Sequence, residues 1–546
     1  MSLDSLKPAV PEVKKQAFSF DHVLKRVLFV LGIGVLVLVV FVAKFDSLSD
    51  VNAVDYAQIA RNVAEGKGFT TSAVTPLALA LVGKGQETPD ISRPPLWVST
   101  LALAMRIGGA NDRVVVFVSI LFLLLTLILV YALARMFFDD GVGIYAVAIT
   151  AISTGLMVQA LTGLETTFLA FLITILFGVL LLHGRSERGM ANFWPLLTGL
   201  LLGLCFLVRY ECLAIVPAIL LYWLFAGKEK RWSRMWLTIG TFVVVAVPWV
   251  IRTDMITQRL AGSTQSYELI MQTVAHPGQT LYRQFTEIPP LPLSVMIDHP
   301  LQMLVKFNEG IRTAYAGFPQ LLNPYVLTLF LASLFIPVMR DRFGLIQWCL
   351  VTAIFLMTAS MALYTNVLRL LLAFAPLIVI FATAAFTTHL NDYSRKRWGS
   401  DLLTVSRWVR HLALLGWILV LAYPMADYLL ATRPTRQAAM VATVSEVASK
   451  GSFVVTDIPW HMAWYGEKRS LLLPQSIVQL DAIRKAGVRP DTVYLSPNLI
   501  NIPQSENLRE WQQLLFSGND FSDFTRSKDW RKAGVIWKIA PQGPKQ

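Results

Sequence analysis

The chain has 546 residues, of which 55% are hydrophobic and only 15% are charged, and its formal net charge is +13. A soluble globular protein carries roughly a quarter charged residues. This composition therefore excludes a disordered chain, a disulfide scaffold and an ordinary soluble enzyme, and it indicates a polytopic membrane protein with some water-exposed structure. The three cysteines lie inside apolar runs without metal-ligand spacing, so we expect them to be small buried hydrophobes.

About eleven apolar runs follow one another along the chain, and many approach the roughly 20 residues that a spanning helix needs. They cover residues 27–43, 114–138, 141–161, 166–182, 193–208, 213–225, 236–251, 324–338, 345–363, 368–387 and 412–428. The sequence therefore predicts a polytopic α-helical module at residues 27–430 with about 11–13 transmembrane helices.

The basic residues predict the orientation of this module, because cytoplasmic loops are enriched in lysine and arginine. Basic clusters precede the first run and recur within residues 185–188, 228–234, 340–342 and 395–410. Placing them in the cytoplasm makes residues 1–26 a cytoplasmic lead, and it puts a first loop, 45–112, and a long loop, 253–323, outside. This requires that segment 94–107 lie along the membrane as a juxtamembrane helix. Most of the positive charge is then explained by the cytoplasmic loops, and nucleic acid is not expected as a partner.

Residues 431–546 differ in composition from the rest of the chain. Short strand patterns at 453–456, 470–473, 492–495 and 534–537 alternate with helical patterns at 436–449 and 477–485. They predict a small C-terminal α/β domain outside the membrane.

The first outer loop contains the most informative polar residues. Asp50, Asp55 and Tyr56 begin a short amphipathic helix that ends at Gly66. A carboxylate at a membrane surface, beside aromatic and amide groups, can act as a general base. Aspartates are also typical of a plain helix start, so spacing alone leaves both interpretations open.

Further acids and arginines occur at the outer ends of other runs. They are Glu165 between two runs, Arg209 and Glu211 in a tight turn, and Arg252 and Arg369 at single run ends. Each alone fits a helix cap, an ion pair or a snorkelling side chain. Together, around one cavity, they suit transfer of a group from a phosphate-bearing lipid. Arginines would stabilise the departing phosphate, and a carboxylate would deprotonate the attacking hydroxyl.

At these residues the chain resembles the GT-C class of integral membrane glycosyltransferases. The parallels are protein O-mannosyltransferases, the lipid A aminoarabinose transferase and mycobacterial arabinofuranosyltransferases. The resemblance covers most of the chain, and its motifs are the stretches 56–62, 66–69, 93–97, 163–166, 209–211, 248–252 and 369–376. The tail stretches 456–460 and 463–466 resemble the outer domain of bacterial members, without a catalytic role that the sequence explains.

The resemblance implies inverting transfer of a sugar from a polyprenyl-phosphate donor to a hydroxyl of a glycan, glycolipid or protein. It implies a bacterial inner-membrane protein with a cytoplasmic N-terminus and a periplasmic C-terminal domain. An acid of the first loop would be the base, and Glu165 would orient the acceptor or a metal. Arg93 stands where the aminoarabinose transferase has a lysine that handles lipid phosphate. The other expected substrate-binding residues are Tyr56, Arg209, Glu211, Arg252 and Arg369.

The sequence departs from the family pattern at one position. Related enzymes usually carry the catalytic aspartate four positions before the motif tyrosine, and here that position is Asn52. Asp55 is our preferred substitute over Asp50, and an inactive relative is the alternative if neither serves. The loop has no Asp-x-Asp, so no tightly bound metal or other cofactor is expected. A weak divalent-ion site shared with Glu165 stays open.

Two other functions compete with sugar transfer. A transporter or flippase for a lipid-linked saccharide usually has inverted repeats and mid-membrane broken helices, and the sequence shows no repeat. A structural membrane subunit would use the tail to bind partners. Loss of function on changing the outer acids would separate an enzyme from such a subunit.

Overall fold

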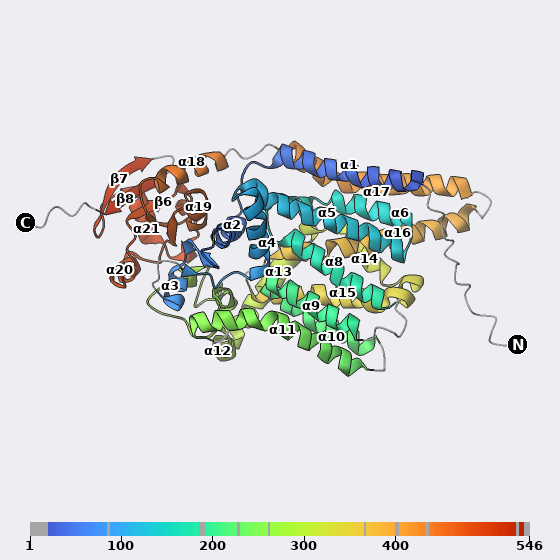
Figure 1. Ribbon diagram of the computed structural model, residues 1–546, viewed down its shortest axis with the longest axis horizontal. Coiled ribbons are helices and arrows are strands. Elements are labelled where there is room, and N and C mark those ends of the chain that lie inside the picture. The colour runs from blue at the N-terminus through green and yellow to red at the C-terminus, as the bar shows by residue number, and fades with distance from the viewer. Residues whose placement is uncertain are drawn as a thin grey trace, which may run out of the picture.

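The computed structural model describes residues 20–83, 88–184, 192–226, 230–259, 262–364, 367–398, 403–431, 436–530 and 534–539. A bundle of long helices fills one part of the molecule, and a sheet with short helices lies at the opposite end of the long axis (Figure 1). Residues 1–19 of the predicted cytoplasmic lead and the basic stretches 185–188 and 228–229 lie outside the described residues.

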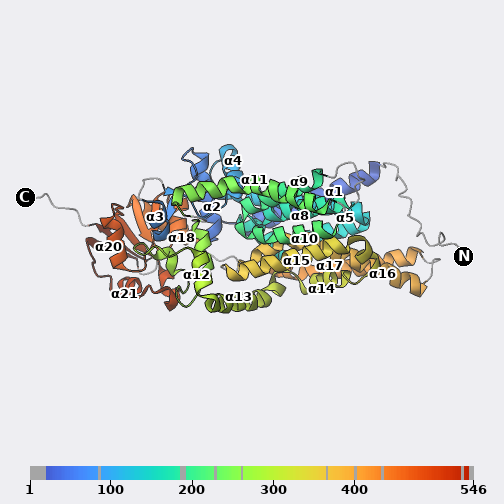
Figure 2. The same ribbon diagram turned by 90° about the horizontal axis from the view of Figure 1, so that it is seen from below.

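Six helices within the described ranges are long and apolar enough to cross a membrane. They lie in α5 (Asp112–Phe137), α8 (Thr166–His183), α11 (Arg231–Thr257), α15 (Pro337–Leu363), α16 (Ala375–Trp398) and α17 (Leu403–Leu430). A helix with apolar side chains on all sides is stable when it is buried in lipid or protein. Inside a membrane, a helix also satisfies its backbone hydrogen bonds within itself. Figure 2 shows the long helices lying side by side along the long axis.

The remaining predicted runs are shorter or bent helices. α6 (Asp140–Ala151) and α7 (Thr154–Thr162) form one bent pair, with an angle of 56° between them. Four more runs form α1 (Phe20–Lys44), α9 (Phe193–Val208), α10 (Ile215–Phe225) and α14 (Pro324–Ser333). The polytopic helical fold class predicted from the sequence is therefore confirmed, and all three cysteines are buried and free.

Several shorter helices gather between the bundle and the sheet. They are α2 (Val51–Ala64), α3 (Pro76–Val82), α4 (Pro95–Gly108), α12 (Pro292–Asp298) and α13 (Pro300–Leu321), with 3-10 turns η3 (Tyr210–Ala214), η4 (Thr264–Leu269), η5 (Thr280–Arg283) and η6 (Leu368–Phe374). α4 corresponds to the juxtamembrane helix predicted at 94–107. It begins at Pro95, as expected of proline in a first helical turn.

The C-terminal sheet has six strands in the order β2-β5-β4-β6-β8-β7. β4 (Phe453–Thr456), β5 (Arg469–Leu472) and β6 (Thr492–Leu495) are parallel, whereas β8 (Gly534–Ile539) and β7 (Phe524–Trp530) are antiparallel to their neighbours. The helices α18 (Arg436–Ala448), α19 (Pro459–Tyr465), α20 (Ile477–Lys485) and α21 (Arg509–Ser517) accompany these strands. The small C-terminal α/β fold predicted from the sequence is thus present.

The sixth strand of this sheet comes from the first loop, residues 45–112. β2 (Ala73–Val74) pairs in parallel with β5, in the register Ala73 to Ser470 and Val74 to Leu471. The amide of Ser470 donates to the carbonyl of Ser72 at 2.8 Å. A separate small ladder joins β1 (Thr70–Thr71) to β3 (Thr88–Pro89) in the same loop. The first loop is therefore built into the C-terminal sheet, which fixes α2 between the sheet and the bundle (Figure 1).

Candidate functional site

The helix α2 separates the two candidate bases by their surroundings. Asp50 is the N-cap of α2, and its Oδ1 accepts hydrogen bonds from the amides of Asn52 at 2.8 Å and Ala53 at 3.3 Å. Asp55 lies in the second turn of the helix, and only 4% of its surface is exposed. Asp50 thus takes the capping role that the sequence offered, because it satisfies otherwise unpaired amides.

Asp55 is paired with Arg93. The Nε of Arg93 lies 2.7 Å from Oδ2 of Asp55, and its Nη2 donates to Oδ1 of Asn52 at 2.9 Å. The same guanidinium lies 4.8 Å from the ring centroid of Tyr56. Burial lowers the pKa of Arg93, but the carboxylate of Asp55 raises it above its usual value. Asn52 therefore helps to hold this cation.

A second charged cluster surrounds Arg209. Its Nη2 lies 2.5 Å from Oε1 of Glu211, and its Nη1 lies 3.5 Å from Oε1 of Glu165. The Nη2 of Arg369 lies 3.4 Å from the same oxygen of Glu165. Glu165 stands at the N-cap of α8 but makes no capping hydrogen bond, and it is fully buried. It therefore serves as the shared counter-ion of two arginines.

The two clusters form one network. The Nη1 of Arg209 contacts the hydroxyl of Tyr56 at 3.4 Å, and the Nε2 of Gln265 donates to Oε1 of Glu211 at 3.2 Å. Seven residues singled out from the sequence are thereby brought together: Asp55, Tyr56, Arg93, Glu165, Arg209, Glu211 and Arg369. Their three carboxylates balance their three guanidiniums, as buried charges require.

A cavity of about 420 Å³ opens beside this network. Asp55 and Arg93 line it together with residues from the long outer loop and the C-terminal domain, among them Gln265, Glu268 and Trp460. Its size falls within the roughly 300–1,000 Å³ typical of small-molecule sites. Among the described residues that line the cavity, Asp55 is the one carboxylate of the charged network. Glu165 and Arg209 are not part of this lining.

Arg252 has a different position from the other predicted arginines. It donates to the carbonyls of Asp90 at 3.0 Å and Phe69 at 3.2 Å, and it lies 4.4 Å from the ring centroid of Trp249. These contacts tie α11 to the first loop. Arg252 therefore holds the segment that precedes Arg93, and it does so from outside the charged network.

Asp90 is a cavity residue that the sequence reasoning missed. It is 3% exposed, and it accepts hydrogen bonds from the hydroxyl of Ser92 at 2.7 Å and the amide of Arg93 at 2.9 Å. Burial, and then the nearby carboxylate of Asp55, raise the pKa of Asp90 to about 6. The available signal was an aspartate two residues before a serine in a turn, which is a common loop pattern. Glu268 and Tyr282, from the long loop, had no such signal.

No group of three or more His, Cys, Asp or Glu side chains is arranged to hold a metal ion within the part of the chain that the structure describes. The acids of the network are instead neutralised by arginines. A divalent ion at Glu165 would have to displace Arg209 or Arg369, whose charges lower the pKa of Glu165 against the effect of burial.

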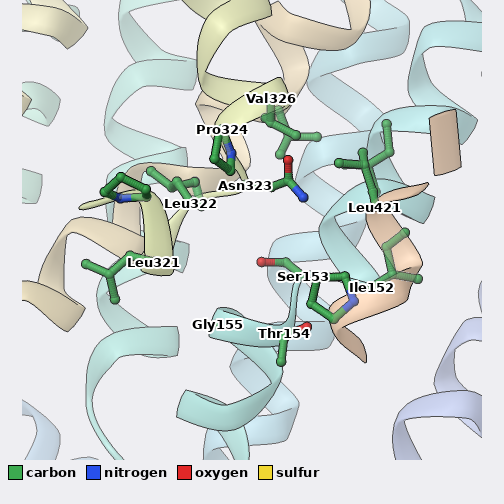
Figure 3. A pocket seen from close by; sticks show the side chains of 15 residues that line it. Ile152, Ser153, Thr154, Gly155, Leu321, Leu322, Asn323, Pro324, Val326 and Leu421 are labelled. Carbon is green, nitrogen blue, oxygen red and sulfur yellow. The ribbon is translucent and has the colours of Figure 1, made fainter. Parts of the chain in front are cut away.

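A second cavity, of about 290 Å³, lies among the bundle helices (Figure 3). Ser153 and Thr154, at the break between α6 and α7, face Asn323 and Pro324, at the turn between α13 and α14, across it. The rest of its lining is mainly aliphatic, and none of the predicted site residues takes part. Charged-group chemistry therefore belongs to the cavity beside Asp55.

Comparison with known proteins found one matching family model. Residues 92–251 match the family model of dolichyl-phosphate-mannose-protein mannosyltransferases. A search of curated protein sequences found no significant match.

Several solved structures share the fold. ArnT from Cupriavidus metallidurans bound to undecaprenyl phosphate is 14% identical, with a TM-score of 0.57 over 95% of this chain and 99% of that one. Archaeal oligosaccharyltransferase AglB from Archaeoglobus fulgidus, in complex with an inhibitory peptide and a dolichol-phosphate, is 12% identical, with a TM-score of 0.54 over 95% and 75%. The Archaeoglobus fulgidus oligosaccharyltransferase complex with Zn and sulfate is 14% identical, with a TM-score of 0.55 over 86% and 68%.

The chain is therefore a polytopic membrane protein with the fold of the GT-C glycosyltransferases. The resemblance inferred from its motifs is confirmed by the match of residues 92–251 and by the shared fold.

Proposed function

We propose that the protein transfers a sugar, with inversion, from a polyprenyl-phosphate donor to an acceptor hydroxyl at the outer face of the bacterial inner membrane. The observation that carries this proposal is the carboxylate of Asp55, which lines a cavity and is held 2.7 Å from Arg93 at the edge of a buried arginine network. Undecaprenyl phosphate and dolichol-phosphate are the lipids named for two proteins of the same fold, which supports this donor class.

Asp55 is the proposed general base. Its carboxylate accepts the proton of the acceptor hydroxyl as that oxygen bonds to the anomeric carbon of the donor sugar. The bond between the anomeric carbon and the phosphate oxygen breaks, and the electron pair leaves with the phosphate. Arg93 keeps the carboxylate in place through their ion pair at 2.7 Å. Asp50 is committed to the helix cap instead.

Arg93 and Arg369 are the proposed contacts of the donor phosphate. Their side chains are 15% and 16% exposed, whereas Arg209 is 3% exposed. The Nε of Arg369 is buried without a hydrogen-bond partner, so it has a donor to offer to an oxyanion. Arg209 pairs with both Glu165 and Glu211, so its proposed role is to hold the network in place without contacting the donor.

The function is tested in proteoliposomes that contain the full-length protein and undecaprenyl-phosphate sugars with a tritium label in the sugar. Membrane extract from the source organism serves as acceptor. We expect the label to leave the donor fraction and to appear in a new, covalently bound product. Labelled donor that crosses the bilayer intact would indicate a transporter, and label that stays unchanged on one side would indicate an inactive relative.

A further inference from the structure

A short stretch of the C-terminal domain reaches the cavity beside Asp55. Trp460, in α19, lines this cavity, and so does Thr75, which follows β2. Both residues lie beyond the carboxyl ends of parallel strands in one sheet, β4 and β2. This is the edge at which α/β sheets bind ligands. The tail stretch 456–460, whose role the sequence does not explain, therefore supplies part of the wall of the candidate site.

The helix α19 is fixed firmly against the helix that carries Asp55. Arg61 of α2 donates to the carbonyls of Ala463 at 2.5 Å and Trp464 at 2.9 Å, and its guanidinium lies 5.0 Å from the ring centroid of Trp464. The indole Nε1 of Trp464 donates to Asp112 at 2.6 Å. Trp460, one turn earlier, is therefore held in a constant position relative to Asp55.

The cavity lining has the chemistry of a carbohydrate site. The indole of Trp460 lies among planar hydrogen-bonding groups and the phenol of Tyr282, which come from other segments. These are Asp90, Glu268, Gln265, Gln272, Gln279 and Tyr282. A sugar ring presents an apolar face of C–H groups, which packs on an aromatic ring, and hydroxyls at its edge, which pair with amides and carboxylates.

The position of Trp460 assigns it to the acceptor side. Figure 1 shows α19 next to α2, on the side away from the long helices of the bundle. Arg369, one of the two proposed phosphate contacts, lies in η6, which leads into α16 of that bundle, and it is not among the residues that line the cavity. The acceptor hydroxyl has to reach the carboxylate of the proposed base, Asp55, and Trp460 lines the same cavity as Asp55.

We propose that the acceptor is a saccharide, the sugar of a glycan or a glycolipid, and that its ring stacks on Trp460. This inference rests on the proposed function and adds the acceptor class to it. A serine or threonine of a protein acceptor would present no ring to the indole.

Binding is tested without turnover by hydroxyl-radical footprinting of the full-length protein in lipid nanodiscs. Methyl pyranosides at millimolar concentration are the probe, and a short threonine peptide is the alternative probe. The oxidation rate of Trp460 is expected to fall about twofold when half of the sites hold a saccharide. Trp232, which is 59% exposed at the start of α11, is the reference. No protection by any pyranoside, or protection by the peptide alone, would overturn the proposal.

A second, kinetic experiment separates an effect on acceptor binding from structural damage. Trp460→Ala is expected to raise the half-saturating concentration of a glycolipid extract about tenfold, equivalent to about 1.4 kcal/mol. Its melting temperature and its slow hydrolysis of the labelled donor by water are expected to stay unchanged, and Trp460→Phe should restore most of the loss. Phe516→Ala is the matched control, because Phe516 is 73% exposed on α21 of the same domain. The proposal is contradicted if Trp460→Ala leaves the half-saturating acceptor concentration unchanged, or if this variant loses sugar transfer and donor hydrolysis to the same extent.

The outcomes distinguish this inference from the function beneath it. If the wild type releases sugar from no donor while pyranosides still protect Trp460, the proposed transfer fails and the saccharide site stands. If the wild type transfers sugar and Trp460→Ala has the same half-saturating acceptor concentration, only the proposed saccharide site fails.

Discussion

At the residue scale, Arg209 is the hub of the buried network. It neutralises Glu165 and Glu211, and its side chain is 3% exposed. Removing one partner of a buried ion pair costs about 3–5 kcal/mol, because the other charge is left without compensation. We therefore expect Arg209→Met to lower the free energy of unfolding by about that amount.

Thermal unfolding in detergent measures this effect. Arg106→Met is the control, since exposed Arg106 donates only long bonds of 3.4 Å to the carbonyls of Val63 and Ala64. A similar small change in both variants would show that the network does not depend on Arg209.

The buried carboxyl of Asp90 is expected to make the stability of the folded protein depend on pH. Its pKa is raised to about 6 in the folded protein from an ordinary value near 3.8. The folded state therefore holds the proton more tightly than the unfolded state, and the stabilisation present below about pH 4 is lost as the pH rises through about 6. The loss amounts to ~3 kcal/mol. We expect Asp90→Asn, which stays neutral, to gain melting temperature relative to the wild type above pH 6. Parallel melting curves across this range would contradict the shift.

At the element scale, the contact between α2 and α19 depends on Arg61. Hydrogen bonds to charged groups contribute about 1.5–3 kcal/mol each, and Arg61 makes two to backbone carbonyls of α19. We expect Arg61→Ala to increase amide hydrogen exchange in α19 and in the last turns of α2. Lys67→Ala, which removes an exposed pair with Glu65, should leave both helices unchanged. Unaltered exchange in α19 would show that its other contacts, such as the bond from Trp464 to Asp112 and the sheet pairing of β2, hold it without Arg61.

The sequence predicted local elements well and non-local ones poorly. Strands at 453–456 and 492–495 and the helix at 477–485 were correct in their bounds, because each has its own hydrophobic pattern. β2 was missed, since two residues have no pattern of their own and their partners, Ser470 and Leu471, lie far along the chain. The helix α13 was also missed inside the predicted long loop, because charged residues such as Lys306, Glu309 and Arg312 are scattered among its apolar residues.

At the scale of the whole molecule, the basic clusters predict that the N-terminus is cytoplasmic and the C-terminal domain is outside. Single cysteines test this in intact cells, because the three native cysteines are buried. A membrane-impermeant maleimide is expected to label Ser517→Cys in α21 and to leave Ser233→Cys, in the basic start of α11, unlabelled. Ser233→Cys should react only after the cells are opened. The reverse labelling pattern would invert the topology.

The membership of the charged network could be predicted from the sequence, but its pairings could not. The outer ends of apolar runs meet at one membrane face, which is why Glu165 and Arg369 could be expected near each other although 204 positions separate them. Which acid bonds which arginine depends on the packing of side chains. Trp460 lines the cavity beside Asp55 although the two residues lie far apart in the sequence, and contacts between the first loop and the C-terminal sheet, such as the pairing of β2 with β5, have no local pattern in the sequence.

The most direct measurement compares sugar transfer by Asp55→Asn and Asp50→Asn in the same proteoliposomes. Asparagine caps a helix about as well as aspartate, so Asp50→Asn should fold and transfer at nearly the wild-type rate. Asp55→Asn cannot accept a proton, and its transfer rate should fall at least about a hundredfold while donor binding persists. Full activity of Asp55→Asn together with loss of activity in Asp50→Asn would contradict the assignment of Asp55 as the base.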